Sequence, residues 1–167
     1  MAEQAGSKPD LLQPTDAEAI KLARKLIGEA RFGALAVLQP QTGHPFVSRV
    51  AVSTTESGVP LIFVSSLSQH TQALLADPRC SLLLGEPGKG DPLAHPRVTL
   101  LCEARQIARD SSEHETTLAR HLAHHPKAKL YASLGDFSFF RLEPQRASLV
   151  GGFGRAYSMS RAELLPQ

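Results

Sequence analysis

Tryptophan is absent from this chain of 167 residues, and aromatic side chains make up only 5% of it. No apolar run approaches the ~20 residues that a membrane-spanning helix needs, and the first ten residues lack the apolar core of a signal peptide. Lysine and arginine form no run, and a net charge of +2 is too small to indicate nucleic-acid binding. The sequence therefore predicts an ordinary globular protein with neither a membrane nor a nucleic acid as partner.

Cysteine is also scarce, and the sequence contains only Cys80 and Cys102. Both stand inside apolar segments that read as strands, and we expect buried thiols there, not a disulfide or a metal pair. Reduced thiols and the missing signal peptide favour the cytoplasm.

The domain organisation follows from composition and helix signals. Residues 1–13 are polar and are predicted to be a disordered tail, residues 14–157 form one domain, and 158–167 form a C-terminal tail. The domain opens with a helix whose capping box is Thr15-Asp16-Ala17-Glu18.

Period-two alternation and apolar runs bounded by turn residues predict the strands. These are residues 32–38, 45–55, 61–64, 80–84, 97–108, 136–142 and 147–150, with short helices expected from Ser68 and from Ser112. Hairpin-connected strands with interposed helices favour a mainly β fold with inserted helices (α+β), namely a six- to seven-stranded antiparallel split β-barrel.

One segment after the third predicted strand is rich in hydroxyls. It reads Ser65-Ser66-Leu67-Ser68-Gln69-His70-Thr71 and leads into a short helix. Hydroxyls and free backbone N–H groups at a helix start can bind an anion, and Arg49 on the neighbouring strand can add a guanidinium. The alternative is that these serines only cap and turn the chain. From the residues alone, both interpretations stay open.

Three histidines fall near the end of the helix that is predicted to begin at Ser112. His121 shares a helical face with His124 and His125, a spacing that can bind Zn²⁺ if further ligands come from elsewhere. The alternative is a solvated helix end. We predict no metal site here.

The order of elements over about residues 15–157 resembles the pyridoxamine 5′-phosphate oxidase-like, FMN-binding split barrel. The resemblance rests on Ser48-Arg49-Val50, on residues 65–74 followed by Asp77-Pro78, and on the strand at 80–84. Four further segments make the chain similar to the haem-utilisation (HugZ-type) subgroup: His70-Thr71, His125-Pro126 with Tyr131, residues 136–142, and Gly151-Gly152-Phe153-Gly154.

The resemblance implies a homodimer with two ligand sites at its interface. The FMN-binding residues that it implies are Arg49, Ser65, Ser66, His70 and Thr71. Two departures matter. The flavin-binding members carry a lysine where His70 stands, and the haem subgroup uses a histidine near the C-terminus, whereas no histidine follows His125.

Three functions remain as hypotheses. The first hypothesis, which is the main prediction, is an FMN-binding protein with a flavin-dependent redox role. If such a protein is an enzyme, it is a flavin-dependent oxidoreductase. The second is a haem-binding or haem-degrading protein. The third is a non-catalytic dimeric binding module.

Overall fold

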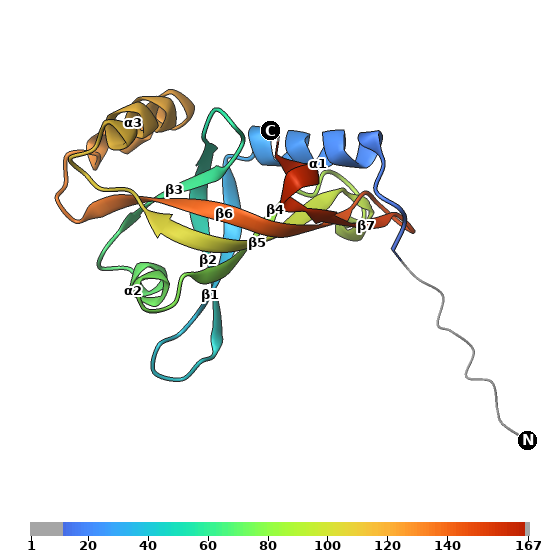
Figure 1. The fold of residues 1–167 in the computed structure, drawn as a ribbon, viewed down its shortest axis with the longest axis horizontal. Coiled ribbons are helices and arrows are strands. Elements are labelled where there is room, and N and C mark those ends of the chain that lie inside the picture. The colour runs from blue at the N-terminus through green and yellow to red at the C-terminus, as the bar shows by residue number, and fades with distance from the viewer. Residues whose placement is uncertain (1–11, 166–167) are drawn as a thin grey trace, which may run out of the picture.

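The computed structural model describes residues 12–165, and seven antiparallel strands form its centre (Figure 1). The strands are β1 Phe32–Leu38, β2 Pro45–Thr54, β3 Pro60–Ser65, β4 Arg79–Leu84, β5 Arg97–Gln106, β6 Phe137–Val150 and β7 Ala156–Ser160. Their order is β3-β2-β1-β4-β5-β6-β7, and β3 also pairs with β6. That pairing closes six strands into a barrel, with β7 added outside, so the predicted antiparallel barrel is confirmed.

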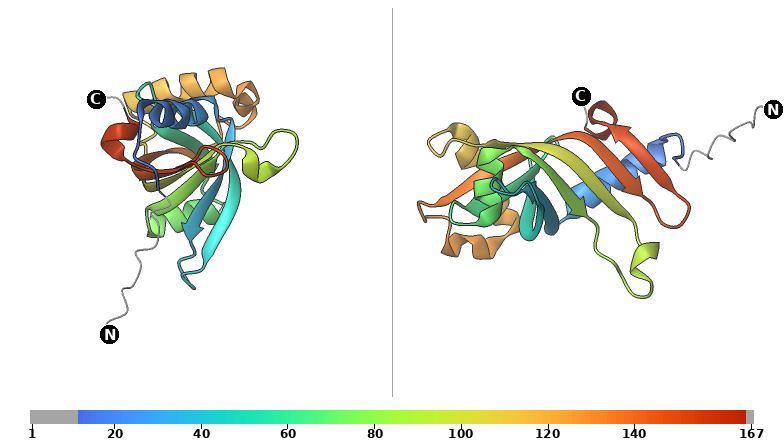
Figure 2. Two further views of the ribbon diagram at one scale, coloured as in Figure 1. Left: turned by 90° about the vertical axis from the view of Figure 1, so that its right-hand side faces the viewer. Right: turned by 90° about the horizontal axis from the view of Figure 1, so that it is seen from below.

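Helices lie around the barrel, with α2 and α3 inserted between strands, α1 before β1 and α4 after β7 (Figures 1 and 2). They are α1 Ala17–Glu29, α2 Gln69–Ala76, α3 Ser112–His124 and α4 Arg161–Leu164, with 3₁₀ turns η1 Pro92–Ala94 and η2 Pro126–Leu130. No helix between residues 12 and 165 is both long enough and apolar enough to cross a membrane.

The long β6 replaces two shorter predicted strands. Cys102 on β5 pairs with Pro144, while the preceding Leu101 pairs with Arg146, so Gln145 is an extra residue in a β-bulge. A proline cannot donate to the ladder, and a bulge is where a strand tolerates one. The prediction of a break at this point was therefore wrong.

Two helix starts lie one residue away from the predicted caps. Asp16, not Thr15, caps α1 by accepting a hydrogen bond from the Ala19 N–H. At α3 the cap is Ser111, which accepts from the His114 N–H, and not Ser112. In both helices a side-chain oxygen at the true N-cap reaches the N–H three residues later.

β3 is buried on both faces, because the barrel interior lies on one side of it and α3 on the other. Ile62 and Val64 belong to the main core inside the barrel. Leu61 and Phe63 belong to a second cluster with Ile107 and Phe139 outside the barrel. Leu118 of α3 and the residues Tyr131 and Ala132, which follow η2, pack against this second cluster.

Residues 12–13 and 158–165, which were predicted to lie in terminal tails, are part of the folded structure. Leu12 forms a parallel bridge with Ala156, and the Gln13 N–H donates to the Ala156 carbonyl. Residues 158–160 complete β7, and the Ser160–Glu163 capping box starts α4. The predicted disorder of residues 1–11 concerns residues outside the described range.

Candidate functional site

The hydroxyl-rich segment joins β3 to α2, and its first serine is already engaged. Ser65 Oγ donates to Asp136 Oδ2 at 2.5 Å and accepts from the Leu67 N–H at 3.1 Å. The Ser66 N–H donates to the Asp136 carbonyl at 2.7 Å. A carboxylate therefore lies beside the hydroxyl that was predicted to bind an anion, and its negative charge disfavours a phosphate there.

Ser68 and Thr71 stabilise the turn itself. Ser68 Oγ donates to the Ser65 carbonyl and lies 2.7 Å from Thr71 Oγ1. Thr71 is only 2% exposed, so its hydroxyl is directed into the fold. The hydroxyls of Ser68 and Thr71 therefore stabilise the turn before α2, as the alternative interpretation of this segment predicted.

His70 is half-buried beside β2, and its Nδ1 lies 3.0 Å from Ser48 Oγ. Burial lowers the pKa of its imidazole, so His70 is neutral at neutral pH. No hydrogen bond to Nε2 is formed within residues 12–165. A neutral imidazole with one nitrogen held and one nitrogen free is suited to metal ligation, and it cannot replace a lysine as a phosphate-binding cation.

Arg49 lies on the outer face of the sheet, because neighbouring residues of a strand point to opposite faces. Its guanidinium stacks 5.4 Å above the Phe32 ring. Both residues line a hollow of about 500 Å³ together with Gly33, Ser48 and Leu83.

The five predicted binding residues thus do not form one cluster within a single chain. Ser65, Ser66 and Thr71 surround the start of α2, whereas Arg49 lies in the outer hollow. His70 connects the two through its contact with Ser48, which also lines that hollow.

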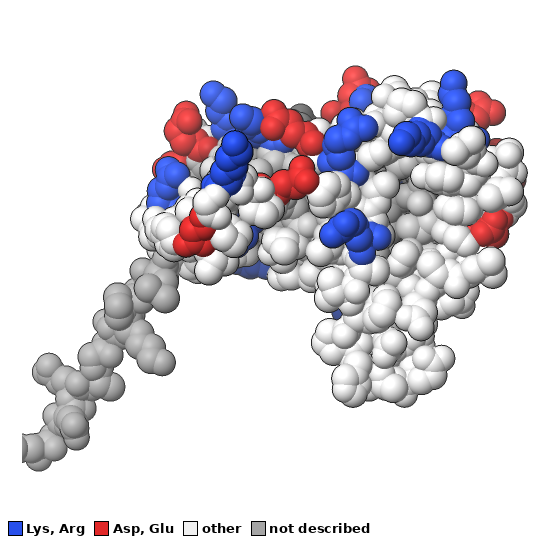
Figure 3. Space-filling model, turned by 180° about the vertical axis from the view of Figure 1, so that it is seen from behind, with Lys and Arg blue, Asp and Glu red and all other residues white. Residues whose placement is uncertain are grey.

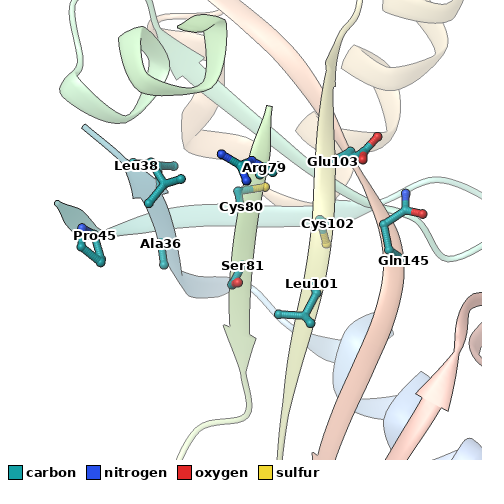
Figure 4. Close-up of a pocket in the computed structure, with 11 residues that line it drawn as sticks. Ala36, Leu38, Pro45, Arg79, Cys80, Ser81, Leu101, Cys102, Glu103 and Gln145 are labelled. Atoms are coloured by element: carbon teal, nitrogen blue, oxygen red, sulfur yellow. The ribbon is translucent and has the colours of Figure 1, made fainter. Parts of the chain in front are cut away.

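A second hollow, of about 410 Å³, lies on the outer face of β1, β4 and β5 (Figure 4). Its lining includes Ala36, Leu38 and Leu101, with Arg79, Glu103 and Gln145 as its long polar side chains. The two cysteines also line it and pair across the strands, and both are buried free thiols, as predicted. Burial raises the pKa of Cys80 to about 12 and also raises the pKa of Cys102, so both thiols stay protonated.

The structure reveals a polar contact that sequence reasoning missed. His121 is 0% exposed, and its Nδ1 lies 2.8 Å from Ser53 Oγ of β2. Burial first, and then the nearby His125 and His124, lower the pKa of His121 to about 4. The alternative of a solvated helix end is therefore wrong for His121. The buried residues of α3 are His114, Thr117 and His121, at i, i+3 and i+7, and these polar side chains form no apolar periodicity from which the sequence could have predicted a buried face.

The Ser53–His121 pair does not have the properties of a nucleophile and its base. An imidazole whose pKa is about 4 is a weak base at neutral pH, and Ser53 is only 3% exposed. No group of three or more His, Cys, Asp or Glu side chains within residues 12–165 is arranged to hold a metal ion.

The closed antiparallel barrel with inserted helices defines this molecule as a split barrel of the pyridoxamine 5′-phosphate oxidase-like fold. A sequence model of the family described as "CREG, beta-barrel" matches residues 14–164. The chain belongs to this family.

Relatives with haem in their names share much of this chain. It is 34% identical over 119 residues to the chloroplastic non-canonical heme oxygenase HOZ of Arabidopsis thaliana, covering 71% of this chain and 36% of that protein. It is 28% identical over 126 residues to heme oxygenase HutZ of Vibrio cholerae, and the match covers 74% of this chain and 71% of HutZ. A solved structure of a heme-binding protein from Mycobacterium smegmatis is 33% identical, with a TM-score of 0.80, covering 92% of this chain and 61% of that one. The chain thus spans about a third of the length of HOZ.

These similarities confirm the resemblance to the haem-utilisation subgroup and overturn the main functional prediction of an FMN-dependent redox protein. The physical reason lies in the predicted phosphate site. His70 is not a fixed cation, and the Ser65 hydroxyl is bonded to a carboxylate. The outer sheet face of the barrel carries two hollows.

Proposed function

We propose that this chain binds haem and handles it as a haem oxygenase-type protein. The observation that carries the proposal is the 34% identity to heme oxygenase HOZ over 71% of this chain. The heme-binding protein from M. smegmatis supports it, because it is 33% identical across 92% of this chain.

The outer hollow beside Arg49 offers the chemistry that a porphyrin needs. Phe32, Val47 and Leu83 supply apolar contact, and Arg49 supplies a guanidinium that can pair with a haem propionate. Bound haem would supply a redox-active iron able to activate O₂. His70 does not line this hollow itself, but it contacts Ser48, which does. The neutral His70 is our candidate for the iron ligand, with Ser48 holding its other nitrogen.

Dimerisation belongs to the same proposal. The outer face of β1, β2 and β4 exposes Phe32, Val47 and Leu83, an apolar surface that a second copy of the chain can cover. The face lacks charge over much of its area (Figure 3). A ligand site bounded by two copies would bury a flat porphyrin better than an open face. The buried reduced thiols fit a cytoplasmic location, which also remains a proposal.

Titration of the purified full chain with haemin, followed by visible absorption, tests the proposal. We expect saturable binding with a Soret band shifted from that of free haemin. Replacing Arg49 by Ala should weaken binding by about 1–3 kcal/mol, the usual value of a charge-assisted hydrogen bond. His70→Ala should change the position of the Soret band.

The control is His44→Ala, since His44 is an exposed turn residue. It should leave both the affinity and the spectrum unchanged. A wild-type chain that shows no saturable Soret shift would refute haem binding. Normal binding with an unchanged spectrum in His70→Ala would remove only the proposed ligand.

A further inference from the structure

Helix α3 is fixed to the barrel at its C-terminal end by a cluster of three histidines, His121, His124 and His125. His121 Nδ1 lies 2.8 Å from Ser53 Oγ, and His125 Nε2 donates to the Val52 carbonyl at 2.7 Å. His124 Nε2 donates to the Ala30 carbonyl at 3.2 Å. Three successive polar contacts to the barrel and the end of α1 thus depend on imidazole rings.

His121 is the residue of this cluster that a proton would disturb most. It is fully buried against the rings of Phe63 and Phe139, with centroids 5.7 and 5.3 Å away. Its Nε2 is buried and has no hydrogen-bond partner. A proton added there would place a charged N–H in an apolar environment with nothing to accept it.

The charges around the cluster do not compensate such a proton. Arg31 of the α1–β1 connection donates to the His124 carbonyl at 2.7 Å, and Arg120 precedes His121 on α3. On the side of β2, β3 and β6, the cluster contacts Ser53, the Val52 carbonyl and the rings of Phe63 and Phe139, all of which are uncharged. His114, the other buried imidazole, lies edge-on to Phe139. The carboxylates Glu56 and Glu113 line a separate hollow with Arg120 and Arg141.

The other end of α3 is attached by contacts that persist in mild acid. Glu113 pairs with Arg105 at 2.7 Å and with Arg141 at 3.1 Å. The Arg105 hydrogen bond lowers the pKa of Glu113, so this carboxylate stays ionised below neutral pH. Acid should therefore not loosen both ends of the helix equally.

We propose that α3 is an acid-sensitive cover of the barrel, whose C-terminal half leaves β2 when the buried His121 is protonated while Glu113 keeps the N-terminal half attached. Departure of the C-terminal half exposes the Phe63 and Phe139 rings and the Ser53 hydroxyl. This inference does not depend on haem binding.

The sign of the pH dependence follows from the burial. Because the pKa of His121 falls from 6.5 to about 4 in the folded chain, its stabilising contribution is complete above about pH 6.5 and is lost as the pH falls toward 4. For His121 alone, linkage gives about a 25-fold lower docking equilibrium at pH 5.0 than at pH 7.5.

Hydrogen–deuterium exchange of the full chain at pH 7.5 and 5.0, corrected for intrinsic exchange rates, tests the proposal. We expect the amides of residues 118–125 to lose about 25-fold protection at pH 5.0. Those of α1 should keep theirs. Equal loss in α1 and α3, or no loss in α3, would overturn the proposal with the wild-type chain alone.

A matched pair of variants identifies the histidine. His121→Gln retains a side chain that can bond Ser53 but cannot gain a proton, so its pH response should largely disappear. His44→Gln, in the exposed β1–β2 turn, should respond as the wild type does. A full 25-fold response in His121→Gln would refute the role of His121.

Discussion

Ser53 shows at the scale of a single residue how a polar group is accommodated in this fold. Its side chain lies on β2 opposite the buried imidazole of His121, and the two form one buried polar contact. A buried polar group that loses its partner pays the cost of leaving water with no hydrogen bond in return.

Replacing Ser53 by Ala should accordingly lower the free energy of unfolding by about 1–3 kcal/mol, because His121 then has no partner at either nitrogen. Chemical denaturation at pH 7.5 measures this change. Ser81→Ala is the control, since Ser81 lies half-buried on the outer sheet face and should change stability by less than about 0.5 kcal/mol. Equal effects of the two variants would contradict the importance of the contact.

At the scale of elements, the sequence located most helices and strands, while the exact helix starts required the structure. Two adjacent serines, Ser111 and Ser112, can each serve as the N-cap of α3 by residue type. Only the backbone conformation selects Ser111, whose oxygen accepts from the His114 N–H.

The two serines give a direct comparison. Ser111→Ala should lower the free energy of unfolding by about 1 kcal/mol, the usual value of an N-cap side chain. Ser112→Ala should change it by less than about 0.5 kcal/mol, because its hydroxyl caps nothing. Thermal or denaturant unfolding of both variants measures the difference, and the reverse order would place the cap one residue later.

At the scale of the whole molecule, the outer face of β1, β2 and β4 is the surface on which the proposed dimer depends. Leu83 is exposed there and lines the same hollow as Arg49. An arginine placed at the centre of an apolar interface would have to be desolvated without a partner.

We therefore expect Leu83→Arg to turn a dimer into a monomer, measured by size-exclusion chromatography with light scattering. The wild-type chain should have about twice the 18.0 kDa mass of one chain. Leu130→Arg is the matched control, because Leu130 is 84% exposed on η2, away from that face. A wild-type chain of monomeric mass would refute the dimer.

The sequence by itself determined most of the segments that become strands and helices, because alternation, turn residues and caps act over a few neighbouring residues. It did not indicate β7, and it divided β6 into two strands. It also determined the family resemblance, since motifs such as Ser48-Arg49-Val50 are local. Burial of the two thiols followed from their apolar surroundings.

The tertiary structure decided which face of each strand or helix is buried and which residues, distant in the sequence, that face contacts. Closure of β3 on β6 places α3 over the outside of the barrel and buries His121, although its sequence neighbours resemble those of a solvated helix end. Strand alternation places Arg49 on the outer face and the adjacent Ser48 against His70, which separates residues that chemistry alone would have grouped. Contacts between residues far apart in the chain set both outcomes, and no local pattern encodes them.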